Sequence, residues 1–555
     1  MKKLVLFLLL MASVCAQAQI ATNIYWVQFT DKNDSPYSIS NPEAYLSMRA
    51  LDRRARLGIG IDEYDIPVNP QYLQAVADCG AEIINPSKWL NGVSVYVTNP
   101  AVIDAINALD FVNVVRNCPN DLKAQERKER WLADEMKASE MSRGNRDGYY
   151  GGASNQNSQI RADYLHGQGF RGEGMVIAVL DGGFSGADTH PAFDNMREEG
   201  RLLGTRSFHR GHPSVYSMST HGTSCLSTMG AFVPETLVGT APKASYYLFH
   251  TEHGEYENIV EEYNWISGAE LADSLGVDVC TTSLGYYDFD MEEWNHPYED
   301  YDGHTAPMSI GAEIAVSRGM ICLIAAGNRG DSYNGECTII IPADAEHVLT
   351  VGAVDSGGNR CWFSSMGPTF DGRIKPDVMA QGGGTYVAGY GNWNGNPEHY
   401  YYNGDGTSFA TPVMAGAVTC LWQANPLASV NDICEAVRQS GNRASHPDNY
   451  YGYGIPNLEN AMTMLHVEDT FSPGKEIIRV YPNPSQGRVH VALEEGYQTE
   501  LSVYDLMGRH LMDYHFNGLN HTTLESWLNS LGNGLYFINA VSDRGVQTVK
   551  LMIER

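Results

Sequence analysis

Four polar residues of this sequence have the types that acyl transfer through a serine requires. They are Asp181, His221, Asn328 and Ser408, and they lie far apart in the chain. An imidazole oriented by a carboxylate can take the proton of a serine hydroxyl, which makes the oxygen nucleophilic. A side-chain amide can donate a hydrogen bond to the oxyanion that follows. The four residues therefore predict a hydrolase site, provided that the fold brings them together.

Each of these residues also has a structural explanation when it is taken alone. Asp181 and Asn328 are of the types that cap helices or occupy turns. The glycine-rich turn at Ser408 resembles a phosphate cradle, although the lysine of a P-loop is missing. Three other histidines lie nearby in the sequence, His190, His209 and His212, and any of them could serve as the base instead of His221. The hydrolase hypothesis therefore depends on the four residues occurring together.

The segments around Asp181 and Asn328 predict an α/β fold. Asp181 follows the apolar run 176–180, and Asn328 follows the run 322–327. Apolar runs without alternation are typical of strands that are buried on both faces of a parallel sheet. Helical segments separate such runs between residues 148 and 466, which predicts a parallel sheet with helices on both faces. Open sheets of this kind bind ligands at the carboxyl ends of their strands, where both residues stand.

His221 and Ser408 are each expected near the start of a helix. Small residues follow His221, so its side chain can face a cleft while the helix packs below it. Ser408 lies in a glycine-rich turn just before the apolar helix expected over 413–422, and the glycines allow a tight turn onto that helix. The free N–H groups at a helix N-terminus favour a developing negative charge.

Together these residues and their surroundings resemble the subtilisin-like serine peptidases, whose triad runs Asp, His, Ser in chain order. The resemblance covers about residues 148–460. It includes further matching segments at 172–174, 239–242, 282–285, 363–368 and 375–377. One departure is Gly182, where the family usually has Ser or Thr, and it puts in doubt only how the neighbouring carboxylate is held.

The resemblance implies a role for each site residue. Ser408 would attack the peptide carbonyl, His221 would move the proton, and Asp181 would fix the imidazole tautomer. The amide of Asn328 and the backbone N–H of Ser408 would bind the oxyanion. An extended edge would pair with the substrate as an added β-strand, and it would consist of Ser283, Leu284 and Gly285. The structural alternative for that edge is the end of a buried strand.

Residues 1–18 are expected to be a secretory signal peptide. Lys2 and Lys3 precede a short apolar run, and Ala16-Gln17-Ala18 provides an Ala-x-Ala cleavage site. Cys15 leaves a lipoprotein signal as the alternative, but bulky Val14 precedes it where a small residue is usual.

Residues 19–120 predict a small α+β domain that looks like the inhibitory propeptide of the same family. Alternation predicts strands at 24–29 and 93–97, and helical spacing occurs at 72–81 and 102–109. Such a domain would assist folding and block the cleft until it is cut. The charged tract 121–147 that follows is expected to be an exposed linker and the maturation region.

The C-terminal part, after a linker at 467–474, predicts a small β-sandwich over residues 475–555. Its segments 480–485, 503–509 and 534–536 resemble the sorting domain of type IX secretion. That resemblance implies Sec export to the periplasm and then translocation across the outer membrane of a Bacteroidota-like cell. The alternative is an ordinary β-module used for binding.

Composition narrows the function further. A chain of 555 residues is expected to fold as two or three units. Its formal net charge of −29 argues against nucleic acid as a partner. Protein or peptide substrates are expected, and the chemistry requires no cofactor.

The family often binds structural calcium, and the acidic stretch 299–302 is a candidate, with a solvated loop as the alternative. Spacing alone leaves open whether Cys337 and Cys361 form a disulfide.

Two rival functions stay open from the sequence. A protease scaffold kept only for binding would not need all four site residues, and the same triad could also hydrolyse esters. The propeptide-like domain favours peptide substrates, so we expect a secreted serine endopeptidase made as an autoinhibited precursor.

Overall fold

The computed structural model describes most of the expected domains. The described residues are 23–118, 148–252, 257–330, 337–393, 396–426, 428–465, 478–481, 485, 490–493, 498–505, 509–517, 521–523, 531–542 and 545–553. The expected signal peptide and both expected linkers lie outside these residues. The chain divides into two compact units, and the C-terminal sheets belong to the second.

The N-terminal region is an antiparallel sheet with strand order β2-β3-β1-β4. Strand 24–29 was predicted with its observed bounds, and the other predicted elements are present with shifted ends. A further helix, α2, was not predicted. The elements are β1 (Ile24–Phe29), η1 (Pro42–Ala44), α2 (Met48–Leu57), α3 (Pro70–Asp78), β2 (Glu82–Ser87), β3 (Gly92–Tyr96), α4 (Ala101–Asn107) and β4 (Val112–Asn117).

Strand β1 is buried on both faces. Val27 and Phe29 pack into the core of the N-terminal region, whereas Ile24 and Trp26 belong to the main core of the neighbouring α/β domain. The ring of Trp26 stacks on Tyr263 of that domain, with centroids 4.2 Å apart. The N-terminal region therefore shares a hydrophobic core with the α/β domain.

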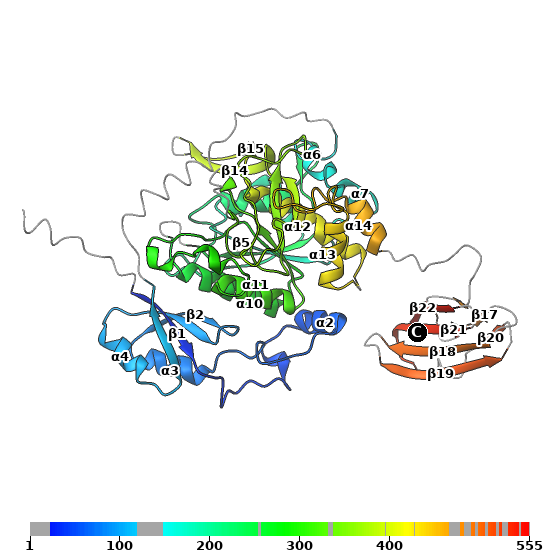
Figure 1. Cartoon of the computed structure of the whole chain (residues 1–555), viewed down its shortest axis with the longest axis horizontal. Helices are drawn as coiled ribbons and strands as arrows, with labels where there is room; N and C mark the ends of the chain where they lie inside the picture. The colour runs from blue at the N-terminus through cyan, green and yellow to red at the C-terminus, as the bar shows by residue number, and fades with distance from the viewer. Residues whose placement is uncertain are drawn as a thin grey trace, which may run out of the picture. The chain divides into compact units, whose positions relative to one another are not determined.

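The α/β domain is built on a seven-stranded parallel sheet with strand order β13-β12-β11-β10-β5-β9-β6 (Figure 1). All neighbouring pairs are parallel, as the apolar runs predicted. The strands are β5 (Val176–Asp181), β6 (Leu202–Ser207), β9 (Ser245–His250), β10 (Val279–Thr282), β11 (Ile321–Ala325), β12 (Leu349–Val354) and β13 (Val378–Gln381).

Helices cover both faces of this sheet. Alternate strand residues such as Ala178, Cys280 and Cys322 pack against α10 (Val260–Leu275) and α11 (Pro307–Ser317). Because successive side chains of a strand point to opposite faces, the residues between them face the other layer. There α12 (Thr407–Ala424) lies on β10 to β13, and α9 (His221–Gly230) packs against α12.

Smaller elements complete the domain. A hairpin of β14 (Thr385–Trp393) and β15 (Asn396–Gly404) packs on α9. The remaining elements are α6 (Ser154–Ser158), α7 (Ala162–Gly167), η3 (Pro191–Phe193), α8 (Asp194–Glu198), β7 (Phe232–Val233), β8 (Leu237–Val238), η4 (Glu292–Trp294), η5 (Tyr298–Asp300), α13 (Val430–Gln439) and α14 (Leu458–Leu465).

The C-terminal unit contains two antiparallel sheets, in agreement with the predicted β-sandwich. One has strand order β16-β17-β20 and the other β19-β18-β21-β22. Ile478 of the first sheet shares a core with Leu501, Ile538 and Leu551 of the second. The strands are β16 (Ile478–Tyr481), β17 (His490–Leu493), β18 (Gln498–Asp505), β19 (His510–Asn517), β20 (His521–Thr523), β21 (Gly534–Ser542) and β22 (Gly545–Ile553).

Within the described ranges, the helices are all too short or too polar to cross a bilayer. Cys361 is a buried free thiol, so the disulfide between Cys337 and Cys361 that the sequence left open is not formed. Burial raises the pKa of the Cys361 thiol to about 12.

A buried ion pair fixes the start of α11. Glu262 on α10 accepts hydrogen bonds from His296 Nε2 (2.6 Å) and from the backbone N–H of Met308 (2.9 Å), and His296 Nδ1 lies 3.3 Å from Asp300. Burial lowers the pKa of His296, but the carboxylates of Glu262 and Asp300 outweigh it and raise the pKa to about 9. The imidazole is therefore charged at neutral pH and ties the loop to both helices.

His296→Gln is expected to destabilise the protein by about 3 kcal/mol at pH 6, because a raised pKa of this size stabilises the folded state by that order. This contribution is complete below the unfolded-state pKa of about 6.5 and disappears as pH rises through about 9. Urea unfolding from pH 6 to 10, in a background with Ser408→Ala to prevent autolysis, measures the effect. His347→Gln, which removes an exposed pair with Glu313, is the control. A difference that did not shrink with pH would contradict the assignment.

Candidate active site

Asp181 and His221 are in direct contact at the carboxyl edge of the sheet. Asp181 is the last residue of β5 and is completely buried, and His221 is the first residue of α9. The Nδ1 atom of His221 lies 2.8 Å from Asp181 Oδ1. This contact fixes the ring orientation and favours the tautomer that keeps a proton on Nδ1, which leaves Nε2 as the basic nitrogen.

Gly182 contributes its backbone N–H to the carboxylate of Asp181. Oδ1 of Asp181 accepts this N–H at 2.8 Å and also contacts His221, so one oxygen makes both contacts. The other oxygen, Oδ2, is buried and accepts no hydrogen bond from the described residues. The contact between Asp181 and His221 is therefore present with glycine at position 182.

The environment of His221 favours a charged ring. Burial lowers the pKa of this imidazole, but the Asp181 carboxylate raises it, with a smaller contribution from Cys225, and the result lies well above the ordinary value. Cys225 is one helical turn further along α9, and its Sγ lies 3.8 Å from Nε2 and 3.9 Å from Nδ1. Burial raises the pKa of the Cys225 thiol, so the sulfur stays protonated beside the ring.

Ser408 lies in the first turn of α12, and not before it as the sequence suggested. The helix begins at Thr407 and continues through Pro412 to Ala424. Proline has no N–H, so Pro412 cannot bond the carbonyl four residues earlier, which is that of Ser408. The Ser283 hydroxyl donates to this carbonyl at 2.7 Å, and the Cys225 thiol donates at 3.3 Å. Side chains from two other elements therefore hold the backbone of Ser408.

The Ser408 hydroxyl points to the end of β10 in this structure. Its Oγ donates a long hydrogen bond of 3.4 Å to the Ser283 carbonyl, and Ser408 is 4% exposed. It makes no hydrogen bond to His221 among the described residues. Such contacts are often loose without substrate and tighten when it binds. Asp181 thus contacts His221 directly. Cys225 contacts both the His221 ring and the Ser408 carbonyl, so Ser408 lies close to this pair.

Asn328 is held by the residue that precedes the serine. Its Oδ1 accepts hydrogen bonds from the backbone N–H of Thr407 (2.9 Å) and from the Thr407 hydroxyl (3.0 Å). With the oxygen engaged, the amide NH₂ is the group that remains for a ligand. A Cβ placed on Gly406 would lie 3.7 Å from both Asn328 Nδ2 and Ser408 Cβ, so the amide and the serine flank the same backbone.

The segment Ser283–Gly285 follows β10, and Ser283 contacts Ser408. Leu284 is 5% exposed, and Gly285 packs against Ile340 and Ile341. Ser283 contacts Ser408 through both its hydroxyl and its carbonyl, and the sequence did not predict these contacts.

Two further contributors, Thr407 and Cys225, were also missed. Thr407 precedes Ser408 in the same glycine-rich turn, and Cys225 stands four residues after His221 in a helical segment. Spacing of i,i+4 places two side chains on one helix face, and this is the signal that could have identified Cys225.

The structure offers one cluster with metal-ligand geometry among the described residues, Asp181, His221 and Cys225, whose ligand atoms lie within 4.8 Å of one another. A thiol binds metal as the thiolate, and burial raises the pKa of the Cys225 thiol, which opposes metal binding. Asp181 and His221 therefore fit the expected triad with Ser408 better than a metal centre with Cys225. In the calcium candidate 299–302, Asp300 pairs with His296. Asp302 accepts hydrogen bonds from the turn at His304 and Thr305.

Comparisons with known proteins cover the three expected parts of the chain. The subtilase family matches residues 172–454, the peptidase S8 propeptide domain of Bacteroidota matches 24–132, and a secretion-system C-terminal sorting domain matches 479–554. The sorting domain indicates a secreted or surface-located protein.

Curated relatives include several subtilisins and a further serine protease. Subtilisin DY of Bacillus licheniformis is 31% identical over 308 residues, which are 54% of this chain and 96% of the relative. Subtilisin E of Bacillus subtilis is 34% identical over 318 residues (55% and 70%), and serine protease AprX of the same species is 29% identical over 321 (54% and 68%). A solved structure of the prenylagaramide maturation protease PagA aligns with a TM-score of 0.42 at 20% identity, covering 55% of this chain and 98% of that one. Because the subtilase family matches just over half of its length and two subtilisins are more than 30% identical to it, the chain belongs to the subtilase family of serine peptidases.

Proposed function

We propose that this subtilisin-like protease hydrolyses peptide bonds with Ser408 as nucleophile, His221 as general base and then acid, and Asp181 as the residue that orients the imidazole. The observation that carries this proposal is the 2.8 Å contact between His221 Nδ1 and the buried Asp181 Oδ1, beside a serine at a helix N-terminus. It supplies an oriented base, which activation of a serine requires. Further support is the Cys225 thiol, which contacts both the His221 ring and the Ser408 carbonyl.

The chemical steps follow from these positions. Ser408 Oγ forms a bond to the peptide carbonyl carbon while its proton moves to His221 Nε2. The negative charge on the carbonyl oxygen is stabilised by the Asn328 amide and the Ser408 N–H, and the imidazolium by Asp181. His221 then gives its proton to the leaving amine, and water hydrolyses the acyl-enzyme by the same path in reverse.

A fluorophosphonate probe tests this function directly. The secreted protein is labelled, digested and mapped by mass spectrometry, and the phosphonyl group is expected on Ser408 alone. Heat-denatured protein serves as the control, since labelling requires the activated hydroxyl. A label on another serine, or none on protein that hydrolyses casein, would overturn the assignment of the nucleophile.

We further propose that the N-terminal domain, residues 19–120, is an intramolecular inhibitor that is anchored on α10 and α11 by buried charges. Asp273 of α10 is fully buried and accepts hydrogen bonds from three cations of the N-terminal domain, Arg53, Arg54 and Lys88. Burial raises the pKa of Asp273, but the three cations outweigh it and lower the pKa below its usual value. The carboxylate is therefore charged, and its charge is neutralised by residues of the N-terminal domain.

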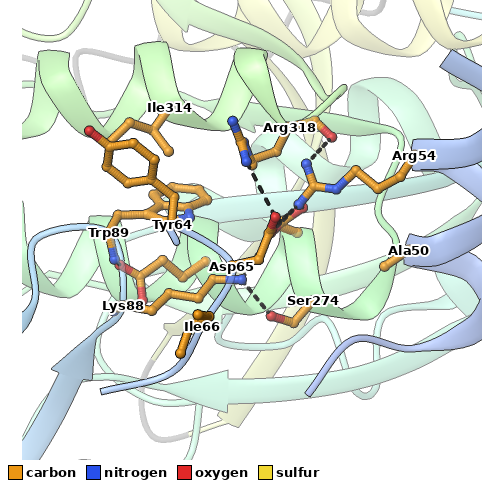
Figure 2. Close-up of polar contacts among 12 residues, drawn as sticks. Ala50, Arg54, Tyr64, Asp65, Ile66, Lys88, Trp89, Ser274, Ile314 and Arg318 are labelled. Carbon is orange, nitrogen blue, oxygen red and sulfur yellow. Dashed lines mark hydrogen bonds and ion pairs between the residues drawn. The ribbon is translucent and has the colours of Figure 1, made fainter. Parts of the chain in front are cut away.

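Figure 2 shows how this cluster extends to the second helix. Arg54 donates to the backbone carbonyl of Arg318 at the end of α11 (2.9 Å) and contacts Asp65, which also pairs with Arg318 (3.3 Å). Lys88 reaches Ser274 of α10 at 3.0 Å. Helix α2 and the β2–β3 turn thus hold both helices at once.

Asp273→Asn is expected to weaken retention of the cleaved N-terminal domain by at least about 30-fold, because breaking a buried charge pair costs about 2–5 kcal/mol. Autoprocessed wild type and variant are compared by size-exclusion chromatography over a dilution series. Glu82→Gln is the matched control, since Glu82 forms an exposed pair with Arg210 across the same interface. Equal dissociation of Asp273→Asn and wild type would contradict the anchor. The maturation site within 121–147 and the type IX export route stay predictions.

A further inference from the structure

Asp181 has a neighbour on the next strand that the proposed mechanism does not use, His250. Asp181 of β5 is paired in register with His250 of β9, and Ser207 of β6 is paired with the same histidine from the other side. Side chains that are paired on neighbouring strands point to the same face of a sheet. Asp181, His250 and Ser207 therefore form a row at the carboxyl edge, on the face where Asp181 contacts His221.

The ring of His250 is held in place, and one of its nitrogens is left for a further contact. Its Nδ1 atom lies 3.1 Å from the hydroxyl oxygen of Ser207, and the ring of His209 stacks on it with centroids 5.7 Å apart. His250 is completely buried. Its Nε2 atom is buried too and has no hydrogen-bond partner in the described part of the chain.

The carboxylate of Asp181 provides the complementary atom. Its Oδ1 has two contacts, whereas its Oδ2 is buried and accepts no hydrogen bond within the described ranges. Gly182, the next residue, offers no side-chain hydroxyl to it. A charged oxygen that is buried without a donor loses its hydration without compensation, which is unfavourable. The site therefore needs a donor at Oδ2.

The charges of the two groups are compatible with a bridge between them. Burial lowers the pKa of His250 to about 4, against smaller opposing effects of the Glu252 backbone and the Asp181 carboxylate. The ring is therefore neutral at neutral pH. A neutral imidazole nitrogen can donate to a water molecule or accept from it, depending on the tautomer. In either case the water keeps a hydrogen that it can donate to Asp181.

We propose that His250 is a positioning residue, which holds one buried water that donates a hydrogen bond to Asp181 Oδ2. The two orphaned atoms lie on neighbouring strands and do not bond each other directly. Water commonly bridges buried polar groups that are too far apart for direct contact. With both carboxylate oxygens bonded, Asp181 cannot rotate away from His221. This inference rests on the proposed function, because it concerns the residue that orients the base.

His250→Leu is expected to lower kcat for a peptide substrate by about 10- to 100-fold, the order expected when one hydrogen bond to a charged group is lost. Leucine fills the volume but cannot hold the water. KM should stay the same, because a completely buried residue does not touch the substrate. His166→Leu is the matched control, at a buried histidine that contacts Tyr150 and Thr240. It should lower the thermal stability and keep kcat.

Gly182→Ser tests the cause of the effect, since it supplies a hydroxyl beside the carboxylate. A Cβ at position 182 would lie 3.3 Å from Glu252 Oε2, the end of a flexible side chain, so serine needs only a small adjustment. In a double-mutant cycle, His250→Leu should lower kcat far less in the Gly182→Ser background than in the wild-type chain. Equal effects in both backgrounds, or a wild-type kcat in His250→Leu, would overturn the proposal.

A high-resolution crystal structure of the Ser408→Ala protein decides the question even if His250→Leu does not fold. One water is expected within hydrogen-bond distance of both Asp181 Oδ2 and His250 Nε2. An Oδ2 atom that is bonded to another donor, or to none, would overturn the role of His250. Loss of fluorophosphonate labelling at Ser408 in wild type would instead overturn the triad and the proposed function.

Discussion

Ser408→Ala is expected to lower kcat for peptide hydrolysis by a factor on the order of 10⁶, the known effect of removing the nucleophile from subtilisin, a relative of this chain. The physical reason is that alanine has no hydroxyl that could attack the peptide carbonyl. The methyl group of alanine fits the same position in the first turn of α12, so folding should be preserved. Residual hydrolysis by water would come from the remaining oxyanion donors and from binding.

The measurement is hydrolysis of a casein-type substrate by the purified precursor, together with the size of the chain on a gel. The precursor of Ser408→Ala should stay uncut if maturation is autocatalytic. Ser445→Ala, at an exposed serine, is the matched control and should mature and hydrolyse casein as wild type does. Ser408→Ala protein that kept more than about a thousandth of the activity would exclude Ser408 as the nucleophile.

Much of the framework was predictable because the positions of the site residues follow from the pattern of apolar runs. Asp181 and Asn328 follow uninterrupted apolar segments, and the structure shows both at the carboxyl edge of one parallel sheet, where such residues face a common cleft. His221 was expected at the start of a helix, and it is the first residue of α9. Local sequence was sufficient for these positions, since each depends on one strand or helix.

The start of α12 was not predicted because proline normally interrupts a helix. The apolar pattern led to an expected helix over 413–422, whereas the helix begins at Thr407 and includes Pro412. The lost backbone bond is replaced by donors from Ser283 and Cys225, which come from distant parts of the chain. Spacing cannot reveal such a replacement, because it depends on β10, α9 and α12 meeting in the folded state.

The contacts of Ile340 and Asp273 were not predictable from the sequence for the same reason. Ile340 reads as one of several isoleucines in an apolar run, and its contact with two glycines appears only when β10 and β11 are side by side. Asp273 reads as an ordinary helix carboxylate, and its partners are in the N-terminal domain. Residue type and local pattern predicted the positions of residues that depend on one strand or helix. They did not predict residues whose contacts come from distant parts of the chain.

Asp181→Asn is expected to lower kcat by a factor on the order of 10⁴, the size of effect that this substitution has in another Ser-His-Asp peptidase. Asparagine matches aspartate in shape, but the Gly182 N–H and His221 Nδ1 both contact the position of Asp181 Oδ1. When the NH₂ group of the asparagine takes this position, it donates to Nδ1, so the ring must carry its proton on Nε2, and the hydrogen bond from Gly182 is lost. That tautomer cannot accept the proton of Ser408.

The pH profile distinguishes this mechanism from simple unfolding. The carboxylate raises the pKa of His221 well above its ordinary value against the opposing effect of burial. Activity requires the neutral ring, so the acid limb of the wild-type profile should lie above the usual range of histidine. Without the carboxylate the pKa falls, and the limb of the residual activity should move to lower pH. Asp194→Asn, at an exposed pair with Arg197, is the control. A loss of less than about tenfold, or a limb that stayed in place, would show that Asp181 does not orient the base.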